Sequence, residues 1–564
     1  MDAIEPEPTR ETPASRLREA ITIGLLVLAL NLAGNGRMSL WDRDEPRFTG
    51  AVREMRARGE WLRPTFNGEP RHHKPILIYW LMRAGMAVGG EGPWGARLVS
   101  AVAGMATCLL VWRLGRRVFG PTVGRLGALA LATAPLMFVE SKIATTDATL
   151  TLWLVGVQSC VWELGRRDSR AAAAGFWAFL ALATMTKGPV GPAFVAVAGL
   201  LGWWWGAPTV AWKRLRWRRG LAGFVALTLP WYVAIGLATR GEFYRFALGL
   251  QGIGRVTEGI EEHGGFPGYY LVLGMITFFP WSSFLPAAVR AAWKQRKARP
   301  EFGYVLGWIV GPLVLLECVR TKLIHYYLPA LPPCALLVAW LVEAVARDVK
   351  SLRRWPLGSV GIGLLVGFGF VATATLLAGV VVLPWPLRRP ALAMAVVLVA
   401  GMLLALERIQ DNRTLPAFQT LILTWTALGF LVALWFVPAF EPYRMAPKVS
   451  RQLAELSKNE GVEPILASLS QPSIIYDLGR RVTILRDRDD LNRHLRTTPA
   501  VVAALLPDEL KPLLYDRRFR VEDRGTIQGI NHDKAREFTV HLVLIRRETD
   551  PSRLARRREP LKIK

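Results

Sequence analysis

Ionisable side chains stand directly beside apolar segments at several points of this sequence. Asp44 and Glu45 precede a helical stretch, and Lys74 precedes a short apolar run. Asp147 opens a longer apolar run, and Lys187 stands between two such runs, followed by Gly and Pro. Ionisable groups so close to hydrocarbon are costly and are usually functional. These residues are therefore candidates for chemistry at a membrane surface.

Other polar residues share this kind of position, and together they indicate the chemistry. They are Arg47, Arg71, His72, His73, Arg255, His263, Lys322, His325, Tyr326 and Tyr327. Lys binds phosphate as a point charge and Arg binds it as a fork. Fixed cations in a low-dielectric cleft stabilise a departing phosphate. A carboxylate such as Asp44 or Glu45 can orient an acceptor and remove its proton. The set suits transfer of a sugar from a lipid-borne phosphate.

Simpler structural roles are open for the same residues. Asp44 and Glu45 would suit a helix N-terminus, where the macrodipole favours acids. Asp147 would serve as an N-cap, and Lys187 would reach the head groups by snorkelling. The remaining residues would be lipid or interface contacts, and two adjacent His without further ligand spacing do not define a metal site. The functional interpretation depends on whether these residues converge on one face of the membrane.

The composition indicates a polytopic membrane protein. Of the 564 residues 52% are hydrophobic, and 22 are Trp and 37 are Pro. This suits interfacial anchors and broken helices. The net charge of +27 could suggest nucleic acid, but the Lys and Arg occur in short clusters between apolar segments. The four Cys have no metal-ligand or disulfide spacing, and no Gly-rich phosphate loop or Rossmann fingerprint suggests a nucleotide-sugar donor.

Spanning helices need roughly 20 mostly apolar residues. On this basis we predict about thirteen spans near 20–37, 96–112, 124–141, 147–164, 172–186, 189–206, 220–238, 267–289, 302–319, 325–343, 357–383, 388–406 and 416–437. The run Ile76–Val88 is too short, carries Arg83 and should lie in the interface or re-enter. With the N-terminus inside, the basic clusters then fall in the cytoplasm, except Arg388 and Arg389. The polar set described above falls outside.

The tail after the last predicted span has the composition of a soluble domain. We predict a transmembrane domain over 1–437, with a first periplasmic loop over 38–95, and a small periplasmic α/β domain over 438–564. Short β-type runs in the tail are Pro464–Leu469, Ser473–Tyr476, Val482–Leu485, Ala500–Leu506 and Phe538–Ile545, and helical stretches separate several of them.

An ordered set of short motifs resembles the aminoarabinose lipid A transferase and protein O-mannosyltransferase group, enzymes of GT-C fold. The set covers roughly residues 38–345. It consists of Asp44-Glu45-Pro46-Arg47-Phe48, Arg53-Glu54-Met55, Phe66-Asn67-Gly68, Lys74-Pro75-Ile76-Leu77-Ile78-Tyr79-Trp80, Ala96-Arg97-Leu98, Gly115-Arg116-Arg117, Ala144-Thr145-Thr146-Asp147, Thr186-Lys187-Gly188-Pro189, His263 with Tyr269-Tyr270, Pro280-Trp281, and Thr321-Lys322-Leu323 with His325-Tyr326.

The resemblance implies residue roles. Asp44, with Glu45 beside it, resembles the catalytic acid. Lys74, Arg255, Tyr326 and Lys187 are then placed at the carrier phosphate, and Arg47, Asp147, His263 and Lys322 elsewhere in the cavity. The sequence departs from the group at Arg71, where an aromatic residue is common, at His73, where Glu is frequent, and at Ile76, which replaces a second proline. These differences leave a divalent metal open, with His72 and His73 as the candidate ligands.

The expected function is transfer of a sugar from polyprenyl (undecaprenyl) phosphate to lipid A or another envelope glycolipid. This would take place at the periplasmic face of a multi-pass inner-membrane protein. One alternative acceptor is a Ser or Thr of a secreted protein, as in protein O-mannosyltransferases. A different class is a transporter or flippase of the carrier, because broken helices and buried cations also suit transport. Membrane lipids are expected partners and nucleic acid is not.

Overall fold

A computed structural model describes residues 12–42, 44–208, 210–247, 249, 265–347, 352, 355–485, 487–531 and 536–549. The chain forms two compact units. The helical unit consists of Met1–Asn35 and His72–Val437, and the α/β unit consists of Gly36–Arg71 and Pro438–Lys564. The loop predicted over 38–95 is thus divided, because its first half packs with the C-terminal residues and its second half with the helices.

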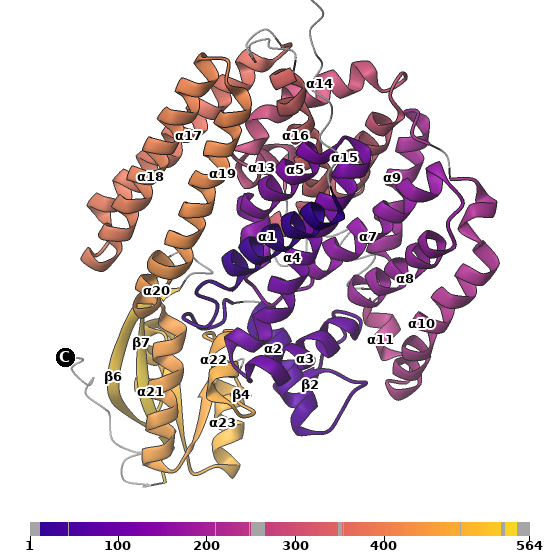
Figure 1. Ribbon diagram of the computed structural model, residues 1–564. Helices are drawn as coiled ribbons and strands as arrows, with labels where there is room; N and C mark the ends of the chain where they lie inside the picture. The colour runs from indigo at the N-terminus through magenta and orange to yellow at the C-terminus, as the bar shows by residue number, and fades with distance from the viewer. Residues whose placement is uncertain are drawn as a thin grey trace, which may run out of the picture. The chain divides into compact units, whose positions relative to one another are not determined.

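The helical unit contains many of the longer helices (Figure 1). Its elements are α1 (Pro13–Leu32), α3 (Leu77–Gly89), α4 (Pro93–Val118), α5 (Pro121–Thr133), α6 (Pro135–Glu140), α7 (Asp147–Arg166), α8 (Arg170–Lys187), α9 (Val190–Trp204), η1 (Trp212–Leu215), α10 (Trp217–Ala238), α11 (Glu242–Tyr244), α13 (Tyr269–Thr277), η4 (Trp281–Phe284), α14 (Leu285–Gln295), α15 (Pro300–Glu317), η5 (Ile324–Ala330), α16 (Leu331–Arg347), α17 (Gly358–Val382), α18 (Trp385–Gln410), α19 (Thr414–Leu431) and η7 (Val432–Phe436), with α20 (Val437–Phe440) following. Each of the predicted spans coincides with one or more of these helices.

Within the described residues, six helices are long and apolar enough to cross a membrane. They are Pro93–Val118, Trp217–Ala238, Ile324–Arg347, Gly358–Val382, Trp385–Gln410 and Thr414–Tyr443. A seventh span results if Tyr269–Thr277 and Trp281–Gln295, which meet at 118°, count as one. The predicted segment Ile76–Val88 corresponds to the 13-residue helix α3 (Leu77–Gly89), with Ile76 as its N-cap, and the buried side chains of α3 include Ile78, Met82 and Met86.

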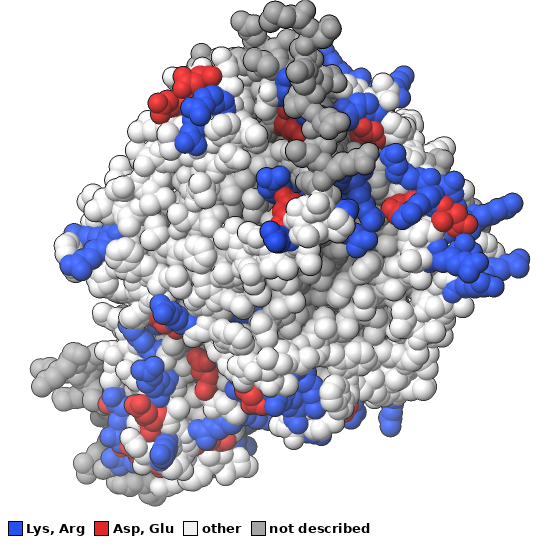
Figure 2. All heavy atoms as spheres, viewed as in Figure 1, with Lys and Arg blue, Asp and Glu red and all other residues white. Residues whose placement is uncertain are grey.

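Large apolar side chains on the outside of this unit suit contact with lipid. On α17 and α18 they include Phe370, Val381, Val396 and Leu403, which are 58–74% exposed. In Figure 2 this area is free of Lys, Arg, Asp and Glu, and charged side chains lie at its margins. An apolar face with polar margins is expected of helices that contact the bilayer.

The α/β unit is built on a five-stranded sheet of order β4-β3-β5-β7-β6. The strands are β3 (Glu463–Leu466), β4 (Thr483–Ile484), β5 (Ala500–Leu505), β6 (Phe519–Asn531) and β7 (Arg536–Arg547). β3 runs parallel to β4 and β5, whereas β7 is antiparallel to β5 and β6. The helices are α2 (Asp44–Ala57), η8 (Glu441–Tyr443), α21 (Met445–Glu460), α22 (Pro472–Leu478), α23 (Arg488–Thr497) and α24 (Pro507–Leu514), and β1 (Thr65–Phe66) pairs with β2 (Glu69–Pro70).

Successive side chains of β5 point to opposite faces of the sheet, and helices pack against both faces. Val502 and Ala504 join a core that contains Val449 and Leu453 of α21. Residues Val501, Ala503 and Leu505 join a second core with α23 and α24. All six residues of β5 are buried, as expected of a central strand covered on both faces.

Two features of the tail differ from the sequence-based prediction. The prediction of a strand over Ser473–Tyr476 is wrong, because these residues lie inside helix α22, which begins at Pro472. Strand β6 was not predicted, because most of its residues are polar or Gly and its apolar positions, such as Val521 and Ile527, are isolated. Its place at the edge of the sheet explains this composition, since edge strands are often rich in charged residues.

Candidate functional site

A buried ion pair joins the ends of two neighbouring helices in the helical unit. Asp147 is the first residue of α7 and Lys187 is the last residue of α8. The Asp147 Oδ1 and Lys187 Nζ atoms are 2.5 Å apart, and their side chains are only 5% and 9% exposed. Gly188 ends α8 with φ +69°, a conformation that favours glycine. The glycine therefore lets the chain turn sharply after Lys187, as the Lys-Gly-Pro sequence predicts.

Further predicted residues surround this pair. The Lys187 ammonium lies 4.5 Å from the ring centroid of Tyr326, a cation–π contact. Lys74 and His325 both lie within electrostatic reach of the Asp147 carboxylate. The structure thus brings together Lys74, Asp147, Lys187 and Tyr326, from four separate parts of the sequence.

Glu140 is a member of this group that the sequence did not single out. It is buried at the end of α6, accepts a hydrogen bond of 3.0 Å from the Thr145 hydroxyl, and acts electrostatically on Lys187. On the other side of the pair, the Thr146 hydroxyl donates to Asp147 Oδ2 at 3.1 Å. The two threonines of the Ala-Thr-Thr-Asp motif therefore orient the two acids.

Lys142 and Arg97 form a second cationic group, at the C-terminal end of α1. Lys142 Nζ donates to the carbonyl oxygens of Asn31 at 3.0 Å and Ala33 at 2.6 Å, and Arg97 donates to that of Asn35 at 2.7 Å. Burial, together with the nearby Arg97 charge, lowers the pKa of Lys142 to about 7. The sequence offered one signal, the Ala-Arg-Leu motif, to which no role was assigned.

Lys322 has a structural partner of its own. Its ammonium forms an ion pair with Glu317 and donates to the Phe266 carbonyl oxygen at 3.3 Å. Glu317 also accepts the backbone N–H groups of Gly268 at 3.2 Å and Tyr270 at 3.3 Å, at the start of α13. Through Glu317, Lys322 therefore stabilises the start of α13.

His72 and His73 contact aromatic rings. Both pack against Phe246, with ring centroids 6.1 Å and 4.8 Å apart, and His72 also packs against Phe243. His72 Nε2 lies 3.9 Å from Glu242, and burial lowers the pKa of His72 despite this carboxylate. In the part of the chain that the structure describes, no three His, Cys, Asp or Glu side chains cluster as metal ligands would.

In the α/β unit, Asp44 and Glu45 occupy the start of α2. Asp44 is exposed and Glu45 is buried. Glu45 Oε2 accepts the Trp41 backbone N–H at 2.7 Å, so its carboxylate closes the turn that enters the helix. Arg47 follows in the first turn and is half-buried. Of the two predicted acids, Asp44 is the one that solvent or a substrate can reach.

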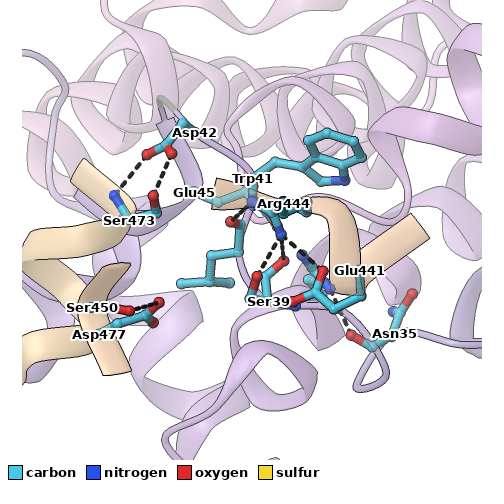
Figure 3. A network of polar contacts seen from close by, with 12 residues as sticks. Asn35, Ser39, Trp41, Asp42, Glu45, Glu441, Arg444, Ser450, Ser473 and Asp477 are labelled. Atoms are coloured by element: carbon cyan, nitrogen blue, oxygen red, sulfur yellow. Dashed lines mark hydrogen bonds and ion pairs between the residues drawn. The ribbon is translucent and has the colours of Figure 1, made fainter. Parts of the chain in front are cut away.

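Residues distant in sequence hold the segment before α2 in place (Figure 3). Asp42 accepts hydrogen bonds from the backbone N–H and the hydroxyl of Ser473, the former at 2.6 Å. Arg444, fully buried, donates to the carbonyl oxygens of Ser39 at 3.0 Å and Leu40 at 2.7 Å. These contacts link the segment before α2 to the start of the C-terminal segment. Two further predicted site residues, Arg255 and His263, lie outside the described residues.

Known sequences support the resemblance. A family profile described as dolichyl-phosphate-mannose-protein mannosyltransferase matches residues 73–233. The undecaprenyl phosphate-alpha-4-amino-4-deoxy-L-arabinose arabinosyl transferase of Edwardsiella ictaluri is 32% identical over 62% of this chain and 62% of its own length. A Sodalis glossinidius protein of the same name is 27% identical over 84% of this chain and 88% of its own length. The first of these matches thus spans less than two thirds of the relative.

Solved structures show the same fold. ArnT from Cupriavidus metallidurans bound to undecaprenyl phosphate aligns with a TM-score of 0.73 over 94% of this chain and 98% of that chain, at 22% identity. An Archaeoglobus fulgidus oligosaccharyltransferase aligns with a TM-score of 0.53 over 87% of this chain and 70% of that chain, at 13% identity. The predicted GT-C-type helical membrane fold is therefore confirmed, and so is the resemblance to the aminoarabinose transferase group.

Proposed function

We propose that this chain is an inner-membrane glycosyltransferase that transfers a sugar from undecaprenyl phosphate to lipid A or another envelope glycolipid. The observation that carries the proposal is the buried Asp147–Lys187 pair, with the half-buried Lys74 and Tyr326 beside it, in the helical unit. Three of these residues, Lys74, Asp147 and Lys187, lie within residues 73–233, which match the mannosyltransferase profile, and aminoarabinose transferases are among the relatives of the chain. The sugar of those relatives, 4-amino-4-deoxy-L-arabinose, is the first donor to test.

The reaction exchanges one bond for another at the anomeric carbon. The bond from this carbon to the phosphate oxygen breaks, and a bond to an acceptor oxygen forms. The departing polyprenyl phosphate gains negative charge, which cations stabilise most strongly in a site of low dielectric. An acceptor hydroxyl loses its proton to a base, whereas a phosphate acceptor of lipid A has no proton to lose. The enzyme therefore needs cations in both cases and a base only in the first.

In this proposal Lys74, Lys187 and Arg255 supply positive charge to the carrier phosphate, and Tyr326 donates a hydrogen bond to it. Asp147 holds Lys187 by its ion pair and keeps it charged. Asp44 is the carboxylate that meets the acceptor, since its exposure supports that role and Glu45 is occupied by the Trp41 N–H.

We further propose thirteen membrane spans, with the chemistry and the α/β unit on the periplasmic side. Basic clusters follow the helix ends at Arg117, Arg166 and Arg347, which suits a cytoplasmic position under the positive-inside rule. Asp147 is the first residue of α7 and Lys187 is the last residue of α8, so each lies at the helix end away from the basic cluster that joins these two helices. Cysteine-labelling of single exposed positions in intact cells would test this arrangement.

Release of undecaprenyl phosphate from its sugar-linked form tests the function directly. Purified protein with undecaprenyl-phosphate aminoarabinose and lipid A should release the carrier and yield modified lipid A. With a hydroxyl acceptor Asp44→Asn should lower the rate 100-fold or more, within the range of about 10²–10⁴ for general acid–base groups. With a phosphate acceptor the loss should be smaller, because Asp44 then orients the acceptor and removes no proton. Glu69→Gln, an exposed acid of the same segment, should leave the rate unchanged. Flipping of the carrier without any sugar transfer would contradict the proposal.

Transfer to protein is a second candidate, because the profile that matches residues 73–233 is described as a protein mannosyltransferase. A hydroxyl acceptor would also give Asp44 a proton to remove. Glycopeptide mass spectrometry of secreted proteins, with and without the gene, separates the two acceptors. Loss of glycopeptides with unchanged lipid A would favour the protein acceptor.

A further inference from the structure

A cavity of about 310 Å³ lies in the helical unit between α4, α7 and the first half of α8. Its polar lining consists mainly of three guanidinium groups and one carboxylate, from Arg113, Arg117, Arg167 and Glu163. Glu163 lies sixteen residues beyond Asp147 in α7, which is about 24 Å along a helix axis at ~1.5 Å per residue. The cavity is therefore separate from the Asp147–Lys187 pair.

The charges of this cavity are not balanced. Glu163 Oε2 lies 3.2 Å from Arg117 Nη1, and Glu163 Oε1 forms an ion pair with Arg167. Among the described residues Arg113 has no hydrogen bond or ion pair. One carboxylate is thus shared by two of the three guanidinium groups, and the lining has a net charge of two positive. Such a lining attracts an anion with several acceptor oxygens, which guanidinium groups bind in fork geometry.

The rest of the wall is apolar. Leu110, Leu114 and Phe179 line it, and α7 approaches α8 closely where Gly156 faces the Phe179 ring. A Cβ at Gly156 would lie 2.7 Å from that ring, so only glycine allows the approach. An apolar wall beside a cationic rim matches the two parts of a lipid, its acyl chain and its phosphate.

We propose that this cavity binds the phosphate of an anionic phospholipid, with the start of an acyl chain against Leu110, Leu114 and Phe179. Basic pockets between membrane helices are known to take lipid head groups in this way. A bias of Arg toward one membrane face accounts for basic residues at helix ends. It does not require three of them to surround one cavity with a single shared carboxylate.

Binding of a fluorescent short-chain phosphatidylglycerol to the full-length protein in a neutral detergent tests the proposal. The wild-type protein should bind this probe at least tenfold more tightly than phosphatidylcholine of the same chain length. Arg113→Gln should weaken binding of the anionic probe about fivefold, and it should fold normally because Arg113 is exposed. The triple variant Arg113→Gln, Arg117→Gln and Arg167→Gln should abolish the preference. The matched control removes the same charge from exposed Lys213, Arg218 and Arg219 and should bind as the wild type does.

Glu163→Gln should change the affinity for the anionic probe in the opposite direction. It releases Arg117 and Arg167 from the only carboxylate of the lining, so affinity for phosphatidylglycerol should rise severalfold. Unchanged affinity in both Glu163→Gln and Arg113→Gln would overturn the proposal. Displacement of the probe by millimolar inorganic phosphate would also overturn it, since the cavity would then select free phosphate and not a lipid. None of these measurements involves the sugar donor, so their outcome is independent of the proposed transferase activity.

Discussion

Asp147 and Lys187 lie forty residues apart in the sequence and 2.5 Å apart in the structure, as a buried ion pair. The acid stands at the N-terminus of α7 and the base at the C-terminus of α8, where each macrodipole favours the charge that is present. The pair fixes the ends of two helices at the place where Lys74 and Tyr326 also lie. The arrangement of the surrounding site residues therefore depends on this ion pair.

Breaking this pair should destabilise the protein strongly. Asp147→Asn or Lys187→Met leaves one buried charge without its partner, which typically costs about 3–5 kcal/mol. The double variant removes both charges and should recover most of that loss, although it should not recover sugar transfer. Thermal unfolding in detergent, followed by Trp fluorescence, measures the stabilities. A double variant as unstable as the single ones would show that the pair is not the cause.

Lys74 should act on donor binding more than on folding. Under the proposed function Lys74→Met removes a charge-assisted contact with the carrier phosphate, worth about 1.5–3 kcal/mol. The KM for the undecaprenyl-phosphate sugar should then rise at least tenfold, and Lys74→Arg should retain part of the affinity. Arg58→Met, at an exposed position, is the control. An unchanged KM in Lys74→Met would remove this residue from the phosphate site.

Acid should loosen the region around His72. Burial lowers the pKa of this imidazole below its usual 6.5 in the folded protein. The unfolded state therefore binds more protons as the pH falls through about 6.5, and stability is lost toward acid pH. His72→Phe should reduce the loss of thermal stability between pH 7.5 and pH 5.5. Equal pH profiles for wild type and His72→Phe would contradict this.

The membrane helices were predictable because their signal is local. A run of about 20 apolar residues must be a helix in lipid, and α17 and α18 satisfy this without reference to the rest of the chain. The sharp turn after Lys187 was predictable for a similar reason, since Gly188 has the φ that glycine favours. The helix break at Phe278–Pro280 within the predicted span 267–289 was not foreseen, because its apolar composition is continuous.

The tail shows where local signals mislead. Two adjacent Ile residues in Ser473–Tyr476 suggest a strand, but Pro472 begins helix α22 and Asp42 accepts the Ser473 N–H at its first turn. That acceptor comes from 431 residues away, so no window of the sequence contains it. Lys142 was missed in the helical unit for the same reason, because its partners Asn31 and Ala33 lie on another segment.

Asn67 should stabilise the α/β unit through its side-chain hydrogen bonds and its left-handed backbone conformation. Its amide exchanges two hydrogen bonds with the Val482 backbone, at 2.9 Å and 2.8 Å, and its φ is +55°. Asn67→Gly keeps access to this φ and loses only the hydrogen bonds, about 1–3 kcal/mol. Asn67→Ala should cost about 1 kcal/mol more, because Ala resists positive φ. Hydrogen exchange at the Val482 amide should accelerate in both variants, and an unchanged rate would contradict the role.

Arg444 should be among the most sensitive positions of the α/β unit. Its side chain is fully buried and donates to the Ser39 and Leu40 carbonyl oxygens while pairing with Glu441 at 3.2 Å. Arg444→Met leaves these acceptors buried without a donor, so we expect a loss of about 3 kcal/mol or more. The segment before α2, which contains Leu40 and Trp41, should then become susceptible to protease, as measured by limited chymotrypsin digestion and mass spectrometry. Arg451→Met, at an exposed position of α21, removes the same charge and should leave the digestion pattern unchanged; equal digestion of the two variants would refute this role of Arg444.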